Sequence, residues 1–212
     1  MHLTKSVVVG LLATAVAWAK PVLHLDFERD PTGFEVVGDV TFELGPRLPE
    51  YPHFAKDNRA GIFDGSGRLV IKDSGKGSPL DFDNGDAITL EAWVSSGMIG
   101  EGDNVYLIGK GRTNNKGFAA NNQNYALRLR GQGGEGCVSF LFFSRPEKGK
   151  HGEWHRWTSD TGVLAEDGWS HVAVTYEFGK PKSVKGYVDG KPVAGRWDMG
   201  GATERPLVLD DD

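Results

Sequence analysis

Residues 168–176, GWSHVAVTY, and residues 186–193, GYVDGKPV, decide the fold class of this chain. In the first stretch, apolar side chains at every second position predict a β-strand with one buried face. In the second, Asp189-Gly190 stands between two strand-like runs and predicts a two-residue type I′ turn, in which both central residues take positive φ. Together the two stretches predict neighbouring antiparallel strands joined by tight turns.

The same period-two pattern recurs outside this region, over residues 87–94, 125–130 and 138–142, with the glycine-rich residues 131–136 as a turn between the last two. The chain has 30 glycines among its 212 residues, which indicates many turns, and no amphipathic helix of ordinary length follows the first twenty residues. Many short strands with frequent turn signals predict an all-β fold, a two-sheet antiparallel β-sandwich, in a single domain.

Two tryptophans and the single cysteine lie on predicted strands. We expect Trp93 and Trp169 to fill the space between the sheets, because large aromatic side chains on strands contribute most to a sandwich core. One cysteine excludes an intramolecular disulfide, and Cys137 is predicted to be a buried structural thiol.

The charge of the chain excludes two classes of partner. Its 24 basic and 29 acidic residues give a formal net charge of −5. Non-specific binding of nucleic acid needs a basic face, so nucleic acid is not an expected partner. The same argument disfavours docking on an anionic membrane surface.

The first 19 residues have the organisation of a secretory signal peptide. Lys5 precedes an uncharged, mostly apolar run over residues 6–16, and Ala17-Trp18-Ala19 supplies a small-x-small cleavage site. The run is shorter than the roughly 20 residues that a membrane span needs. We therefore expect a signal peptide over residues 1–19 and one exported domain over residues 20–212, with no membrane span after cleavage; an uncleaved anchor is the alternative.

Several separated motifs resemble one family. Phe63-Asp64-Gly65 is followed by residues 88–94 (ITLEAWV), by residues 168–176 and by residues 187–191 (YVDGK). This order and spacing resemble the laminin-G-like jelly-roll domains of the concanavalin A-like lectin/glucanase superfamily. The resemblance covers residues 60–212 and implies two antiparallel sheets of about six or seven strands each.

One departure from the family concerns the end of the chain. Members usually continue with a Gly-x-x-Asp-Glu strand that returns beside the first strand, whereas this sequence stops at residues 206–212 (PLVLDDD). The resemblance then implies that the final strands are missing, and we expect the chain to be truncated or to be the N-terminal piece of a longer protein. We expect an unpaired edge beside a strand at residues 22–27.

The candidate ligand-binding residues lie in two long polar loops, predicted at residues 110–124 and 144–159. A sugar site needs an aromatic platform beside hydrogen-bonding side chains, and Trp154 and Trp157, with His155 between them, supply both kinds of group. An alternative interpretation is that one or both tryptophans cap the end of the core.

The first loop contributes the amides Asn121, Asn122 and Asn124, which are candidate ligand-binding residues. Calcium takes carboxylate and amide oxygens, and many relatives carry one such ion at the sandwich rim. The loop amides are all neutral, although residues 210–212 (DDD) could begin a second ligand group. We predict no metal site, with weakly bound calcium as the one cofactor left open and a solvated amide loop as the alternative.

The spacing of acidic residues indicates whether the chain has the carboxylate pair of a glycoside hydrolase. Retaining glycosidases need two carboxylates about 5 Å apart, and the glucanase pattern of this superfamily is Glu-x-Asp-x-x-Glu. Glu101 and Asp103 begin such a pattern, but Tyr106 replaces the final acid. Residues 151–155 (HGEWH) lack the spacing of a zinc protease, and no Gly-x-Ser-x-Gly motif is present. No catalytic residue is predicted.

The sequence therefore predicts an exported, non-catalytic recognition module that binds carbohydrate or a protein partner. We expect it to be secreted, periplasmic or at the cell surface, and to be part of a larger protein, since the family's modules usually sit beside catalytic or redox domains. Two alternatives stay open: a glycoside hydrolase of the same fold, and a purely structural domain.

Overall fold

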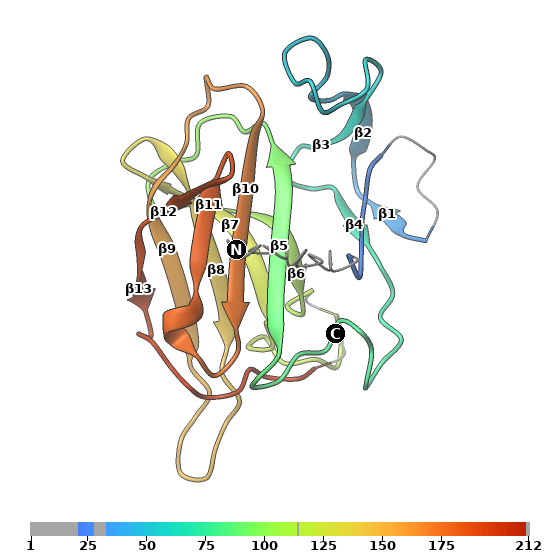
Figure 1. Cartoon of the computed structure of the whole chain (residues 1–212). Coiled ribbons are helices and arrows are strands. Elements are labelled where there is room, and N and C mark those ends of the chain that lie inside the picture. The colour runs from blue at the N-terminus through green and yellow to red at the C-terminus, as the bar shows by residue number, and fades with distance from the viewer. Residues whose placement is uncertain (1–20, 28–32, 114, 211–212) are drawn as a thin grey trace, which may run out of the picture.

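A computed structural model describes residues 21–27, 33–113 and 115–210 of the chain. Two antiparallel sheets lie face to face in it and form the predicted β-sandwich (Figure 1). The one helical element among the described residues is the short 3₁₀ turn η1 (Pro181–Ser183). The predicted signal peptide, residues 1–19, lies outside the described residues.

The four-stranded sheet contains the two stretches that predicted the fold class. Its strands run in the order β12-β11-β10-β5 and are β5 (Ala87–Val94), β10 (Ser170–Glu177), β11 (Lys185–Val188) and β12 (Lys191–Val193). Val188 pairs with Lys191, so the hairpin turn has two residues, Asp189 (φ 48°) and Gly190 (φ 72°). Both φ values are positive, which confirms the predicted type I′ turn.

The five-stranded sheet is built mostly of consecutive hairpins, in the order β13-β9-β8-β7-β6. Its strands are β6 (Asn104–Lys110), β7 (Tyr125–Gln132), β8 (Glu135–Phe143), β9 (Trp154–Val163) and β13 (Gly195–Met199). The predicted glycine turn between β7 and β8 is confirmed. The loop predicted at residues 144–159 is wrong in its second half, because β9 begins at Trp154 and pairs with β8.

Two short ribbons lie beside the sandwich, on the right in Figure 1. They pair β1 (Glu35–Val37) with β4 (Arg68–Val70), and β2 (Val40–Leu44) with β3 (Arg59–Phe63). The strand predicted at residues 22–27 is wrong, since these residues take part in no strand.

The core fills the space between the two sheets with side chains at alternate positions of β5, β7, β8, β9 and β10. Its largest fully buried members include Phe140, Phe142, Tyr176, Phe178 and Leu127. Aromatic rings in this layer contact one another, as Phe140 and Tyr176 do in a tilted arrangement with 5.2 Å between centroids.

The expectation that Trp93 and Trp169 fill this core is wrong. Trp93 is 39% exposed and lies on the opposite face of β5 from Ile88 and Leu90, since successive side chains of a strand point to opposite faces. Its ring contacts Phe54 edge-on at 5.1 Å, outside the sandwich. Trp169 is half-buried and is not a member of the core cluster.

The last described residues pack against the end of β8. Leu207 is fully buried in the core and forms an isolated β-bridge with Ser144. Val208 N donates a hydrogen bond to Phe143 O at 2.8 Å, and Asn124 Nδ2 donates one to Asp210 O. The segment therefore closes the core beneath the loop that precedes β7.

Candidate binding site on the outer face of the five-stranded sheet

Strand β9 separates the three residues that were predicted to form one platform. Trp154 pairs with Phe143 on the outer face of the sheet, whereas His155 and Trp157 pair with Phe142 and Phe140 on the core face. Trp154 is half-buried, while His155 and Trp157 are 1% and 4% exposed. The predicted platform of Trp154 with Trp157 is therefore not formed, because residues at odd and even positions of a strand face opposite ways.

Trp157 is a core residue, as the alternative interpretation expected. Its ring lies against the backbone of two strands: a Cβ added at Gly186 would come within 2.6 Å of the ring, and one at Gly195 within 2.3 Å. Two glycines thus make room for the indole, so Trp157 joins β9 to β11 and β13.

His155 is held inside the sandwich rather than at its surface. Its Nδ1 lies 3.0 Å from Gly201 O, and its ring stacks on Phe142 at 5.2 Å. Burial lowers the pKa of His155, against the opposing effect of the Gly201 carbonyl. The side chain is thus a neutral, packed imidazole at neutral pH.

The asparagine loop serves mainly as an internal support. Asn121 is exposed, but Asn122 and Asn124 are buried. Asn122 Oδ1 accepts a hydrogen bond from Arg112 N at 2.8 Å, which closes the loop on itself. Gln123 Nε2 donates to Lys110 O and Tyr125 O, so these amides satisfy backbone groups between β6 and β7.

The same loop decides whether calcium fits. Two buried amide oxygens, Gln123 Oε1 and Asn124 Oδ1, have no hydrogen-bond partner among the described residues. Calcium takes six to eight oxygens, several of them from carboxylates. Over residues 21–27, 33–113 and 115–210, no three His, Cys, Asp or Glu side chains gather as a metal site. These residues do not fit calcium by themselves; Asp211 and Asp212 lie outside the described residues.

A row of aromatic and arginine side chains crosses the outer face of the five-stranded sheet. The Arg112 guanidinium lies over the Trp154 ring, 5.0 Å from its centroid, and Arg112 Nη1 donates a hydrogen bond to Tyr106 Oη at 2.8 Å. The Tyr106 ring in turn lies 5.3 Å from the Arg128 guanidinium. Trp154, Arg112, Tyr106 and Arg128 thus form a continuous row, named here the outer-face row.

The outer-face row arises from strand register. Arg128 of β7 is paired with Tyr106 of β6 and with Ser139 of β8, so the three share one face. Trp154 enters the same face from β9 through its pairing with Phe143. Arg112 lies just after the end of β6 and returns over the sheet to Trp154. The loops predicted at residues 110–124 and 144–159 therefore each contribute a residue to the row.

A third arginine lies beside the row and is paired with a carboxylate. Arg156 of β9 is paired with Leu141 on the outer face, and its Nε lies 2.7 Å from Asp198 Oδ1 of β13. Planar rings beside hydrogen-bonding groups are what a sugar-binding surface needs, because the apolar face of a sugar packs on a ring while its hydroxyls bond to polar side chains. The outer-face row supplies both within one sheet.

Two carboxylates do meet elsewhere, at one end of β6. Lys110 Nζ contacts both Asp73 (2.8 Å) and Asp81. Burial acts to raise the pKa of Asp73, but hydrogen bonds from Lys110, Gly75 and Ser78 outweigh it and lower the pKa. Both acids are thus ion-paired to one buried lysine. Glu101, which the sequence offered as part of a glucanase pattern, precedes β6 in a turn.

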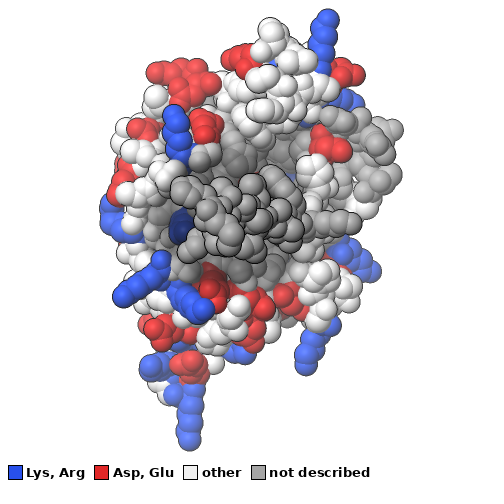
Figure 2. All heavy atoms as spheres, viewed as in Figure 1, with Lys and Arg blue, Asp and Glu red and all other residues white. Residues whose placement is uncertain are grey.

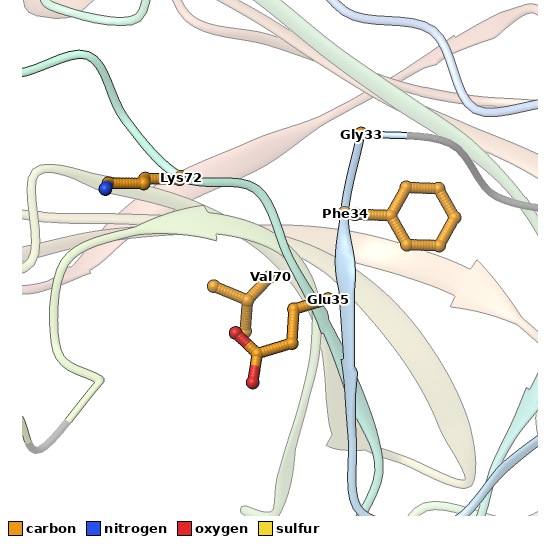
Figure 3. Close-up of a pocket in the computed structure, with 5 residues that line it drawn as sticks. All are labelled: Gly33, Phe34, Glu35, Val70 and Lys72. Carbon is orange, nitrogen blue, oxygen red and sulfur yellow. The ribbon is translucent and has the colours of Figure 1, made fainter.

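Two hollows of the described surface lie away from this row. Gly33, Phe34, Glu35, Val70 and Lys72 line one of about 310 Å³ beside β1 and β4 (Figure 3). Phe34 projects there to the opposite side of β1 from Glu35, so no ring faces the carboxylate. Positive and negative side chains are mixed on the described part of the face shown in Figure 2.

Sequence reasoning missed three of the four members of the outer-face row. Arg128 was not among the predicted site residues, and it is 4% exposed. Its alternation with Leu127 and Leu129 did place it opposite the core, which was the available signal. No sequence signal marked Tyr106 and Arg112, because their contacts depend on how the loop after β6 folds back.

The comparisons with known proteins agree with this architecture. A family model described as the concanavalin A-like lectin/glucanases superfamily, of laminin-G type, matches residues 65–209, which is more than half of the chain. No curated protein and no solved structure matches the chain. None of the helices in the described part of the chain is long and apolar enough to cross a membrane. The chain belongs to the laminin-G-like part of the concanavalin A-like lectin/glucanases superfamily.

Proposed function

We propose that this protein is an exported, non-catalytic recognition module that binds carbohydrate through the outer-face row. The observation that supports it is the continuous contact of Trp154, Arg112, Tyr106 and Arg128 across one sheet. Domains of this family often bind carbohydrate or protein and are typically extracellular. Export, by the signal peptide predicted at residues 1–19, and membership of a larger protein are parts of the same proposal.

The absence of catalysis is also proposed, and the described carboxylates support it. A retaining mechanism needs one ionised carboxylate and one protonated acid. Lys110 contacts both Asp73 and Asp81, and its hydrogen bond helps to lower the pKa of Asp73, so Asp73 is unsuited to be the protonated acid. Release of reducing ends from a bound glycan would contradict this part of the proposal.

A glycan-array screen of the exported protein tests the binding itself, with Trp154→Ala as the decisive variant. We expect binding that Trp154→Ala reduces at least about tenfold, since ring–sugar packing is lost. Trp93→Ala is the matched control, because Trp93 is a partly exposed tryptophan on the other sheet. Loss of binding in Trp93→Ala with full binding in Trp154→Ala would place the site on the four-stranded sheet and contradict the proposal.

Repeating the screen with calcium and then with chelator tests the cofactor. We propose that recognition needs no metal, because the loop amides offer only neutral oxygens, whereas calcium takes several of its ligands from carboxylates. Binding that survives the chelator supports this proposal. Binding that disappears with chelator would move the site to the asparagine loop and the terminal aspartates.

A further inference from the structure

Arg128 carries a buried positive charge with no carboxylate beside it. The side chain is 4% exposed, and its Nη2 donates a hydrogen bond to Ser139 Oγ at 3.1 Å. Its Nε has no acceptor among the described residues, and none of their ion pairs includes Arg128. Because a buried, unpaired charge is unfavourable, this arrangement is typical of a site that an anion completes.

The surroundings of Arg128 add to its positive charge. Arg112 and Arg156 lie on the same face, and Asp198 is the one carboxylate that the described ion pairs bring to the three guanidinium groups. The face is therefore locally positive, although the whole chain has a net charge of −5. Burial lowers the pKa of Arg128, against the opposing effect of Tyr106, and the two neighbouring arginines add to the lowering.

We infer that the outer-face row binds an acidic saccharide, with Arg128 and Arg112 holding its carboxylate or sulfate group and Trp154 and Tyr106 packing against the sugar. This inference rests on the proposed function and names its ligand class. A planar guanidinium offers paired N–H donors that match the oxygens of a carboxylate or sulfate. The two rings favour a sugar over an acidic peptide, which needs no such platform.

The ligand reaches Arg128 and the Trp154 ring by displacing the side chains of Tyr106 and Arg112. Tyr106 is 45% exposed and Arg112 is exposed. The Tyr106 ring lies 5.3 Å from the Arg128 guanidinium, and its hydroxyl accepts the hydrogen bond from Arg112. The hydrogen bond from Arg112 ends on a neutral hydroxyl, so it is weaker than the bonds that an anionic oxygen accepts from a guanidinium. Both side chains belong to an edge strand and the loop that follows it, where rotation meets little packing.

Four probes in titration calorimetry separate the ligand classes: a hexamer of galacturonic acid, the methyl ester of that hexamer, a sulfated galactan oligosaccharide and an oligoglutamate peptide. We expect one or both acidic saccharides to bind, and their relative affinities tell carboxylate from sulfate. The methyl ester, which keeps the sugar and loses the charge, should bind at least about tenfold more weakly. Affinity for the acidic saccharide should fall as salt rises from about 50 to about 300 mM.

Arg128→Met is the decisive variant. It should reduce binding of the acidic saccharide at least about tenfold and leave the melting temperature unchanged or higher, because an unpaired buried charge is replaced by an apolar side chain. Lys185→Met is the control: it makes the same change in net charge, at an exposed position on β11 of the other sheet. Arg128→Lys, which keeps the charge but loses the planar fork, should bind with intermediate affinity.

The outcomes separate this inference from the proposed function. Equal affinity for the hexamer and its methyl ester, or a neutral glycan whose binding requires Trp154, would overturn the acidic ligand and leave the binding module intact. Full binding by Arg128→Met would do the same. Binding of oligoglutamate as tight as that of the saccharides would replace the sugar by a peptide. No binding of any saccharide would overturn the proposed function together with the inference.

Discussion

At the scale of single residues, neighbouring positions on one strand have opposite roles. Trp154 faces outward to Arg112, while His155 and Trp157 face the core. The sequence alone does not distinguish these three residues of β9. The side chain alternates by 180° per residue, so proximity in sequence along a strand means separation in space. The stability and the binding function of β9 should therefore respond to different substitutions.

Truncating Trp157 should damage stability. Trp157→Ala removes a buried indole from between Gly186 and Gly195, and we expect a loss of about 3–5 kcal/mol in the free energy of unfolding. Chemical denaturation monitored by near-UV circular dichroism measures it. Trp154→Ala, on the outer face, should cost about 1–2 kcal/mol. Equal losses in the two variants would contradict the assignment of the two faces.

His155 makes stability depend on pH. Its folded pKa lies below the ordinary value of 6.5 because the ring is buried, so the unfolded chain binds the proton first as pH falls. The free energy of unfolding should decline by at most about 1.4 kcal/mol per pH unit from about pH 6.5 down to the folded pKa. Denaturation curves at pH 7.5, 6.5 and 5.5 measure the decline. His155→Phe should flatten the profile over this window, and an unchanged slope in that variant would contradict the assignment.

At the scale of elements, the turns determine which strands pair. The β11–β12 hairpin depends on Asp189-Gly190, and β7–β8 on Gly133-Gly134, all with positive φ. Such turns match the twist of antiparallel strands and fix their register. Register in turn places Tyr106, Arg128 and Ser139 on one face. The turns therefore act on the candidate site indirectly, through the strands that they align.

Gly190→Ala tests the hairpin turn. A Cβ at Gly190 meets no atom within 4 Å, so the cost is purely that of a positive φ, about 1–2 kcal/mol in the free energy of unfolding. Thermal unfolding with a fixed scan rate measures it. Gly97→Ala is the control, since Gly97 is exposed, has equal space around it and has no positive φ. A loss of the same size at Gly97 would contradict the conformational explanation.

At the scale of the whole molecule, a buried ion triad ties the segment before β5 to the five-stranded sheet. Lys110 at the end of β6 contacts Asp73 and Asp81, and Tyr125 Oη donates a hydrogen bond to Leu80 O. These contacts join residues about thirty to forty-five positions apart, so they form only when the segment before β5 packs on the five-stranded sheet. The triad therefore reports on the packing of this segment.

Lys110→Met should leave two partly buried carboxylates without a counter-ion. We expect a loss of about 2–3 kcal/mol in the free energy of unfolding at pH 7, below the usual range for fully buried pairs because the acids are 13% and 18% exposed. Lys76→Met, at an exposed lysine, is the control. Urea denaturation of both variants measures the difference.

The pH dependence of this loss follows from the direction of the pKa shifts. The pKa of Asp73 is below 3.8 in the folded state and that of Lys110 is above 10.5, so the pairing contributes fully between these limits. As pH falls below about 4, the Asp73 carboxylate gains its proton and its contribution is lost. The difference between Lys110→Met and the parent protein should shrink at pH 3. A difference of constant size would contradict the ion-pair explanation.

The sequence by itself determined the fold class, the type I′ hairpin, the family and the burial of Cys137. These follow from local patterns, because period two, turn residues and motif order are properties of neighbouring positions. Only the tertiary structure decided that Trp93 lies outside the core, that Trp154 and Trp157 face opposite ways, and that Arg112 returns over Trp154 beside a buried, unpaired Arg128. Those facts depend on which strands pair in which register and on how a loop folds back, and distant parts of the chain set both together.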